Sequence, residues 1–477
     1  MALTSFTLPR FTVLSDDDNA VVGKLLKQLD NAQRHNKVVA AYYEGKAIVK
    51  DLGIAIPPHL RTLGSVVGWP GTVVDVLEER LEHNGWVVPG TSDDLGIPEI
   101  VESNQLNEEF SKGHLDALIY GVAFGVVGKG DKERGDPDVL LTVESPTRMT
   151  GLWNRRKRAL EYALCVTVND DDKVDGVAFY KPGATIDLRV SDNTWEIERE
   201  DTHSMTGIPV EPLVNRPRAG DMDGRSEITR AIRYYTDNAI RTVLGMEIAR
   251  EFFSAPQRYI LGASAKDFQD ENGNPLSAWE SYLGRILAIG AMEDGTLPQA
   301  GTFTASSPEP YLLQLRGLAQ LVAAESGMSA TYLGIIQDNP ASADAIRAAD
   351  VRLEKRAERR QRIFGGGEGR LMRKAIWVRD GKDPGVTPKP IWRDAGTPTR
   401  SAQAQDAVAL VTAGILPGDS DVTYERIGLS EADRQRIRAD IRRSRADRMV
   451  SALAAAAESA REGVAGLVGE AGAEGIE

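Results

Sequence analysis

The stretch from Gln337 to Gly367 constrains the fold of this chain more than any other part of its sequence. Asn339 followed by Pro340 predicts a helix start, because an asparagine side chain accepts an otherwise unpaired backbone N–H and proline suits the first helical position. Three consecutive glycines, Gly365 to Gly367, predict the helix end. A narrow apolar stripe at helical spacing lies between these two signals. Its members are Ile346, Ala349, Leu353, Ala357 and Ile363 or Phe364.

The remaining surface of this expected helix is charged. From residue 344 to residue 362 there are seven bases against four acids, in a chain whose net charge is −13. The bases are Arg347, Arg352, Lys355, Arg356, Arg359, Arg360 and Arg362. The pattern is typical of a solvated helix stabilised by (i, i+4) pairs such as Glu358 with Arg362. It is also compatible with a helix that faces a polyanion or the acids of a neighbouring subunit.

Length and charge limit the class of protein. A chain of 477 residues exceeds what one hydrophobic core usually supports, so we expect about two to four subdomains. A net charge of −13 argues against a general nucleic-acid coat, but it is compatible with a protein through which DNA passes without sticking. Cys165 is the only cysteine, which excludes an intrachain disulfide and a thiolate metal cluster and favours folding in a reducing cytoplasm. The apolar run Gly121–Gly128 is too short to span a membrane.

Residues 138–214 contain short runs rich in β-branched and aromatic residues, separated by turn signals. The runs are Val139–Val143, Ala163–Val168, Gly176–Tyr180, Thr185–Val190 and Thr194–Glu198. They predict an antiparallel sheet in an α+β domain. The acidic run Asp170–Asp172 lacks the spaced ligands and the central glycine of a calcium loop, so we interpret it as a polar hairpin.

Apolar residues spaced by three or four predict further helices. They are Ala20–Tyr43, a helix from Trp69-Pro70 to about Asn84-Gly85, a helix passing into a strand over Phe110–Val127, Asp223–Phe253, Pro310–Ser326, Ser401–Thr412 and Ser430–Ala457. The segment Asp223–Phe253 would reach roughly 40 Å, as expected of a strut or of a packing element between subunits.

Other segments are less regular. Ser254–Pro308 is broken by proline and glycine and predicts a small inserted subdomain with one amphipathic piece, Ala278–Ile289. Leu371–Val378 and Pro390–Asp394 are predicted to return to the first domain. The tail Glu458–Glu477, rich in alanine, glycine and glutamate, is predicted to be frayed.

No motif of catalytic chemistry is present. Gly125–Lys129 has too few spacer residues for a phosphate-binding loop, and Gly365–Gly369 follows a helix instead of opening one after a strand. The histidines lie far apart without metal-binding spacing, so each is interpreted as an ordinary surface or core residue. They are His35, His59, His83, His114 and His203. We therefore predict no catalytic residue, no metal site and no cofactor.

Several segments, taken in their order, resemble those of tailed-bacteriophage portal proteins of the type found in long-tailed phages of Gram-positive hosts. They are Tyr42-Tyr43-Glu44-Gly45, Leu52–Pro58, Trp69-Pro70 with Val74–Leu81, Ser306–Tyr311, Tyr332-Leu333-Gly334 and Asn339–Ile346. No single segment is diagnostic, whereas their order from Tyr42 to Ile346 is specific. Gly68 stands where the family pattern leads us to expect asparagine, and Ser329 where proline is common.

The resemblance implies a portal fold: an α/β wing, two long stem helices, a small inserted clip, a channel-facing loop and helix, and an α-helical crown. Twelve copies would form a ring around a DNA channel at one capsid vertex. The implied parts are 1–222 wing, 223–253 first stem helix, 254–308 clip, 309–334 second stem helix, 335–371 tunnel loop and helix, 372–400 return to the wing, and 401–477 crown with a flexible C-terminal tail.

The resemblance also implies residue roles and partners, and it implies no enzymatic activity. A DNA-channel loop would use Gln337, Asp338, Asn339 and Ser342, and channel or subunit contacts would use Arg347, Arg352, Lys355, Arg356 and Arg359. Partners would be the other copies of a homododecamer, double-stranded DNA without sequence specificity, the terminase large subunit, a head–tail adaptor, and the major capsid and scaffolding proteins, but no membrane. The chain would assemble in the host cytoplasm and remain in the virion. The alternatives are a DNA-processing enzyme and a different head–tail adaptor.

Overall fold

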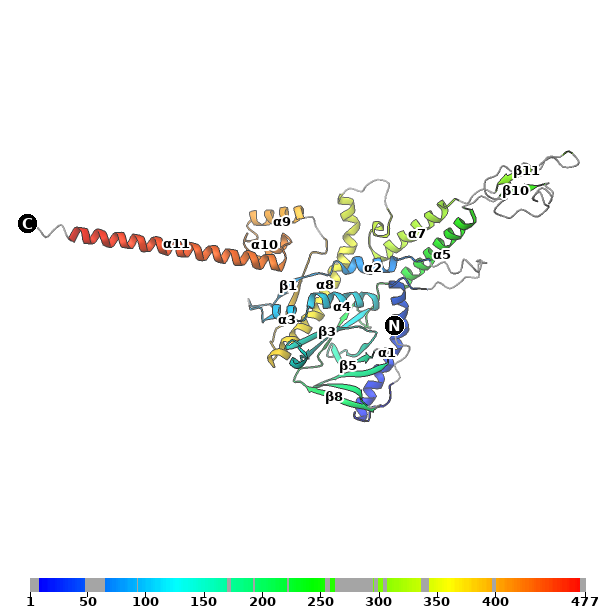
Figure 1. The fold of residues 1–477 in the computed structure, drawn as a ribbon, viewed down its shortest axis with the longest axis horizontal. Coiled ribbons are helices and arrows are strands. Elements are labelled where there is room, and N and C mark those ends of the chain that lie inside the picture. Colours follow the sequence, from blue (N-terminus) through cyan, green and yellow to red (C-terminus); the bar gives the residue numbers. More distant parts are fainter. Residues whose placement is uncertain are drawn as a thin grey trace, which may run out of the picture. The chain divides into compact units, whose positions relative to one another are not determined.

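A computed structural model gives the fold of the chain. It describes residues 8–47, 65–91, 93–169, 173–191, 194–220, 223–253, 258–261, 295, 299–302, 307–335, 343–396 and 400–471. The chain divides into two compact units, each assembled from segments that are distant in sequence (Figure 1). The first unit is Met1–Asn36, Asp75–Ser226 and Asp350–Glu477, and the second is Lys37–Val74 and Glu227–Ala349.

Two antiparallel sheets form the framework of the first unit. The larger sheet has the order β4-β5-β6-β7-β8, with bounds Met149–Asn154, Ala159–Val168, Val174–Lys181, Ala184–Ser191 and Thr194–Thr202. The smaller sheet has the order β3-β2-β9, with bounds Val139–Glu144, Val122–Lys129 and Val210–Val214. The mixed α+β class and the antiparallel strands are therefore confirmed. The prediction of one sheet is wrong, because the run at Val139 pairs with β2 in the smaller sheet.

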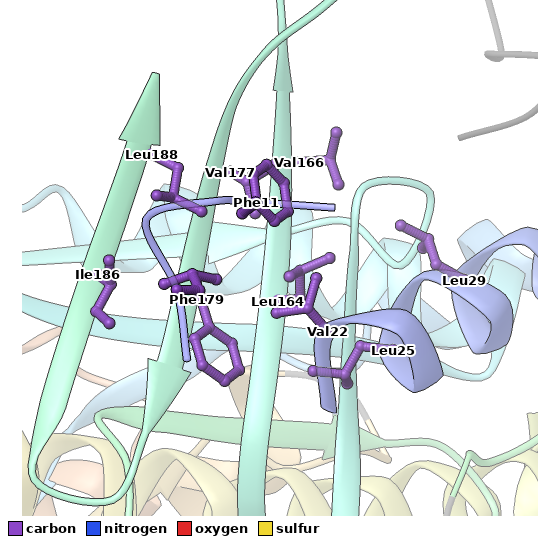
Figure 2. Packing of buried hydrophobic residues seen from close by; sticks show 11 residues of the cluster. Phe11, Val22, Leu25, Leu29, Leu164, Val166, Val177, Phe179, Ile186 and Leu188 are labelled. Carbon is purple, nitrogen blue, oxygen red and sulfur yellow. The ribbon is translucent and has the colours of Figure 1, made fainter. Parts of the chain in front are cut away.

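Alternation along β5 explains why the larger sheet is covered on both faces. Leu164 and Val166 point toward helix α1 (Asp16–Tyr43) and are fully buried. They pack with side chains of α1 and of the neighbouring strands, as Figure 2 shows. The cluster includes Val22, Leu25, Leu29, Val177, Phe179, Ile186 and Leu188. Successive strand residues point to opposite faces, so Ala163 and Cys165 lie in a second cluster on the other side.

The second cluster joins the two sheets. Phe124 and Val126 of β2 pack there with Met149 and Tyr180 of the larger sheet. The opposite face of β2 carries Gly125, which receives Leu371 of helix α8. The order of layers in the first unit is therefore helix, five-stranded sheet, three-stranded sheet, helix.

A third strand pair brings distant parts of the chain together. β1 (His83–Val87) pairs with β12 (Lys389–Trp392) in antiparallel fashion. Helix α2 spans Trp69–Glu78, so the prediction that it continues to about Gly85 is wrong. Leu77 and Leu81 are buried as the apolar spacing indicates. Pairing with β12 takes the following residues out of the helix, an outcome that helical periodicity cannot reveal.

Further helices of the first unit are α3 (Ile97–Ser103), α4 (Leu106–Tyr120), the short η2 (Lys132–Arg134), α9 (Arg400–Thr412), α10 (Asp421–Arg426) and α11 (Glu431–Ala471). The predicted passage from helix to strand near Gly121 is confirmed, because α4 ends there at a φ of 112° and β2 follows. The helix predicted after Ser401 is also confirmed. α11 continues beyond Ala457 to Ala471, so it is longer than the helix predicted over Ser430–Ala457, and the frayed tail from Glu458 stays a prediction.

The second unit contains two helices that pack side by side, α5 (Arg230–Phe253) and α7 (Glu309–Ser326) (Figure 1). Both were predicted, but α5 begins later than Asp223. The unit also holds the hairpin β10 (Arg258–Leu261) with β11 (Gln299–Thr302), and the short η4 (Ala330–Leu333). The predicted amphipathic piece Ala278–Ile289 and the acidic run Asp170–Asp172 lie outside the described residues.

The late start of α5 has a local cause in the first unit. Arg225 donates its backbone N–H to the backbone oxygen of Asn215 at 2.8 Å. Gly224 has a φ of 75°, and a Cβ there would lie 2.0 Å from the Gly121 oxygen. The positive φ of Gly224 is incompatible with a right-handed helix, so α5 cannot begin before this glycine, and the hydrogen bond of Arg225 ties the next residue to Asn215. Over the described residues, no helix has both the length and the hydropathy that a membrane span requires.

Candidate functional site: helix α8 and its neighbours

Helix α8 spans Ala343–Asp380 and passes straight through the glycine run. The predicted helix end at Gly365–Gly367 is therefore wrong, and Leu371–Val378 belongs to the same helix. The predicted start at Asn339-Pro340 lies outside the described residues.

The glycines of α8 serve close packing. A Cβ on Gly365 would lie 3.0 Å from Trp392 Nε1, and one on Gly367 would lie 3.0 Å from Leu213 Cδ2. A Cβ on Gly369 would lie only 2.3 Å from the Pro388 backbone oxygen. The absence of side chains therefore lets β9 and the segment before β12 approach the helix backbone, and these contacts offset the weak helix propensity of glycine.

The apolar stripe is confirmed where side chains are described. Leu353, Ala357 and Phe364 are at most 1% exposed. Ile363 is only partly buried, so Phe364 is the residue that completes the stripe. The side chains of Ile346 and Ala349 are outside the described set.

The bases of α8 divide between surface and interior. Arg352, Lys355 and Arg359 are exposed, as is Arg362, while Arg356 is half-buried. Lys355 forms an ion pair with Glu358 at 2.9 Å, and this pair takes the place of the expected pair between Glu358 and Arg362 among the described residues.

Arg360 is buried, at 5% exposure, which the charge count did not predict. Its Nε donates to Asn215 Oδ1 at 3.2 Å, and its Nη1 donates to the Arg356 backbone oxygen at 3.2 Å. Asn215 in turn donates from Nδ2 to the Arg225 backbone oxygen at 2.7 Å. Arg360 therefore fastens α8 to the first unit and does not belong to the basic surface.

The predicted DNA-channel loop comprises four residues that precede helix α8 in the sequence. Gln337, Asp338, Asn339 and Ser342 lie outside the described residues. Arg347 lies within α8, but its side chain is outside the described set. The roles assigned to these residues stay predictions.

Two histidines and one glutamate meet beside α8. His83 Nε2 donates to Glu368 Oε2 at 3.0 Å, and His114 Nε2 donates to Oε1 at 2.5 Å. These side chains come from β1, α4 and α8, and none is more than 4% exposed. Both histidines are therefore core residues, one of the two kinds of place expected for them, but their sequence spacing carries no sign that they meet. Glu368 follows Phe364 by four residues, so its place on the buried stripe is a signal that could have identified it.

Aromatic rings fix the orientation of the two imidazoles. The His114 ring stacks on Phe364, with ring centres 5.1 Å apart and planes 9° apart. The centre of the His83 ring lies 4.3 Å from the ring centre of Trp392 and 5.5 Å from that of Phe110. Because the neighbouring side chains are aromatic, the two histidines and Glu368 form their hydrogen bonds mainly with one another.

The carboxyl group of Glu368 stays ionised in this surround. Burial alone would raise the pKa of Glu368, but charge on His83 and His114 and their hydrogen bonds outweigh burial and hold the pKa at about 2. The cluster therefore presents a buried anion between two imidazoles. Such a set can hold protons or a metal ion.

Comparisons with known proteins assign the family. A family model described as "Phage portal protein, SPP1 Gp6-like" matches residues 23–420. The portal protein of Mycobacterium phage D29 is 30% identical over 428 residues, which is 87% of each chain. The portal protein of Mycobacterium phage L5 is 31% identical over 415 residues, which is 84% of each chain.

A solved structure titled "Neck of native GTA particle computed with C12 symmetry" contains a chain that is 14% identical, with a TM-score of 0.39. The match covers 76% of this chain and 89% of that chain, but a TM-score below 0.5 does not establish a shared fold. The family match and the two mycobacteriophage relatives each cover most of the sequence, and on these grounds the chain belongs to the phage portal proteins of the SPP1 Gp6-like type.

Proposed function

We propose that copies of this chain form a twelve-membered ring at one capsid vertex, and that the ring is the conduit for double-stranded DNA during packaging and ejection. The observation that carries the proposal is the family match over residues 23–420. Proteins of this family are structural components of the virion, so we assign the chain no catalytic step. The ring assembles in the host cytoplasm before it enters the capsid.

The parts of a portal are assigned as the resemblance implies. The wing is 1–222 with a return at 372–400, the stem helices are 223–253 and 309–334, and the clip is 254–308. The tunnel loop and helix are 335–371, and the crown is 401–477. Helix α8 runs through the proposed boundary at 371, so the tunnel helix and the first part of the return form one rigid element.

The exposed bases of α8 are proposed to face either the channel or the neighbouring copy. Arg352, Lys355, Arg359 and Arg362 are exposed to solvent, on the part of the α8 surface outside the buried stripe. Lys355, Arg362 and Lys389 also line an open hollow of about 850 Å³. In a closed ring each contact is repeated between adjacent subunits, so a base in this hollow meets the same acidic partner at every interface.

An acidic chain suits a conduit. With a net charge of −13, the protein offers few anchors for phosphate along the whole channel, which lets DNA slide without sequence preference. We assign the DNA-facing role to the loop of Gln337, Asp338, Asn339 and Ser342. Docking partners are the terminase large subunit, a head–tail adaptor, and the major capsid and scaffolding proteins.

The double variant Arg352→Glu with Arg359→Glu tests the role of the basic surface. Both side chains are exposed, so the change in folding free energy should stay within about 1 kcal/mol. We expect ring formation, measured by native mass spectrometry, or DNA packaging into capsids, measured by protected DNA, to fall at least tenfold. Lys24→Glu, at an exposed base on α1, is the matched control.

The two measurements separate the two contacts. Loss of rings assigns the bases to the subunit interface, and normal rings with failed packaging assign them to the channel. Normal rings and normal packaging refute both roles. A wild-type chain that stays monomeric under all assembly conditions refutes the proposed ring itself.

A further inference from the structure

We propose that His83, His114 and Glu368 form a binding site for one divalent transition metal ion of the Zn²⁺ class. The site is independent of the proposed DNA-channel surface, and it lies wholly within the first unit. Its ligand atoms are the two imidazole Nε2 atoms and the carboxylate of Glu368.

The donor set and its geometry carry the proposal. Two imidazoles and one carboxylate form a ligand combination that proteins use for Zn²⁺, with the fourth position left to water. The three ligand atoms lie within 4.8 Å of one another. Metal–ligand bonds of about 2.0–2.2 Å place tetrahedral ligand atoms about 3.3 Å apart, whereas the two hydrogen-bonded nitrogen–oxygen pairs are now 3.0 and 2.5 Å apart. Metal entry therefore requires the side chains to move outward by up to about 0.8 Å, and it releases the Nε2 protons that now join the imidazoles to the carboxylate.

A cavity provides the route to the site. His83 and His114 line a hollow of about 310 Å³, together with three glutamates. These are Glu78, Glu79 and Glu82. Their negative charge raises the local concentration of cations, and the space holds the water that completes the coordination.

The surroundings suit a bound ion. Phe364 and Trp392 pack against the two imidazoles, which restricts rotation of the rings and keeps bulk water from the ligand atoms. The ligands come from β1, α4 and α8, so one ion would crosslink a strand and two helices that are far apart in sequence. A bound divalent ion would take over from the protons of the two histidines the compensation of the buried Glu368 charge.

The test uses the tag-free full-length chain, stripped with a chelator and dialysed against Zn²⁺, Co²⁺ or Mg²⁺. We expect one Zn²⁺ per chain by elemental analysis and no retained Mg²⁺, because imidazole ligands disfavour Mg²⁺. Zn²⁺ at one hundred times Kd should raise Tm by about 5–10 °C. Co²⁺ should give the visible absorption of a four-coordinate site.

Glu368→Gln and His114→Gln should abolish stoichiometric binding, whereas His203→Gln, at a histidine outside the cluster, should bind as the wild type does. Circular dichroism identifies any variant that fails to fold, and the wild-type Co²⁺ spectrum then decides alone. If the wild-type chain retains no Zn²⁺ and gives no Co²⁺ spectrum, the proposed metal site is refuted, and the three side chains are joined by hydrogen bonds alone. Retained binding in a folded Glu368→Gln variant overturns the assignment of these ligands.

Discussion

The glycines of α8 give the sharpest prediction, because Gly366 and Gly369 differ in what surrounds them. At Gly366 an added Cβ would meet only the end of the Arg370 side chain, at 3.7 Å. Gly366→Ala should therefore gain the helix propensity of alanine, about 0.5–1 kcal/mol. At Gly369 the same Cβ would lie 2.3 Å from a backbone oxygen of Pro388.

The clash at Gly369 must outweigh the propensity gain. Backbone at Pro388 would have to move by about 1 Å, and overpacking of this kind costs about 1–3 kcal/mol. Taking the upper end, because a backbone atom yields less than a side chain, Gly369→Ala should lose about 2 kcal/mol net. The two variants should then differ by about 3 kcal/mol, or about 6–12 °C in Tm at 2–4 °C per kcal/mol.

Thermal unfolding followed by tryptophan fluorescence measures this difference, since Trp86 and Trp392 report on the first unit. Equal stabilisation by both substitutions would show that Pro388 does not approach the helix as described. Destabilisation by Gly366→Ala would show that the glycine run interrupts the helix after all.

Three further predictions concern buried polar groups. Burial raises the pKa of Asp116 above its ordinary value of 3.8. Ionised Asp116 therefore lowers the stability of the folded chain above the raised pKa, and this loss disappears below pH 3.8, where the group is protonated in both the folded and the unfolded chain. Asp116→Asn should raise Tm at pH 7 and change it little at pH 3. Arg360→Met removes the N–H that Arg360 donates to Asn215 Oδ1 and should lower the free energy of unfolding in urea by about 2 kcal/mol or more. Arg359→Met, at the exposed neighbour, should lower it by less than about 0.5 kcal/mol. Equal losses would contradict the inward placement of Arg360. Burial raises the pKa of the Cys165 thiol, so maleimide should label it only after unfolding, and fast labelling of the native chain would contradict its burial.

Elements with a long, regular period could be predicted from the sequence. The buried stripe of α8 and the bounds of α7 follow from apolar spacing, because burial of one helical face requires that spacing. The continuous apolar run Ala163–Val166 of β5 is likewise typical of a strand covered on both faces. Glycine was interpreted through its freedom at helix ends, yet no glycine between Gly365 and Gly369 has a positive φ. Their role depends on contacts with Pro388 and Trp392, which local sequence does not encode.

The site was harder to predict for two reasons. His83 and Glu368 are separated by 285 positions, so no motif spacing could join them. Charge counting gave every base of α8 the same surface role, although Arg360 follows Ala357 by three residues and precedes Phe364 by four. That spacing places it on the buried face, and periodicity applied to charged residues would have shown it.

The pairing of β1 with β12 means that the first unit cannot finish folding until almost the whole chain has been synthesised. Glu368, the hydrogen-bond partner of His83, leaves the ribosome 285 positions after it, and at about 5–20 residues per second this interval lasts about 15–60 s. During that time β1 lacks its strand partner and the aromatic surround is incomplete. Nascent or truncated chains therefore do not present the finished first unit, and only chains translated beyond Trp392 offer it to other copies.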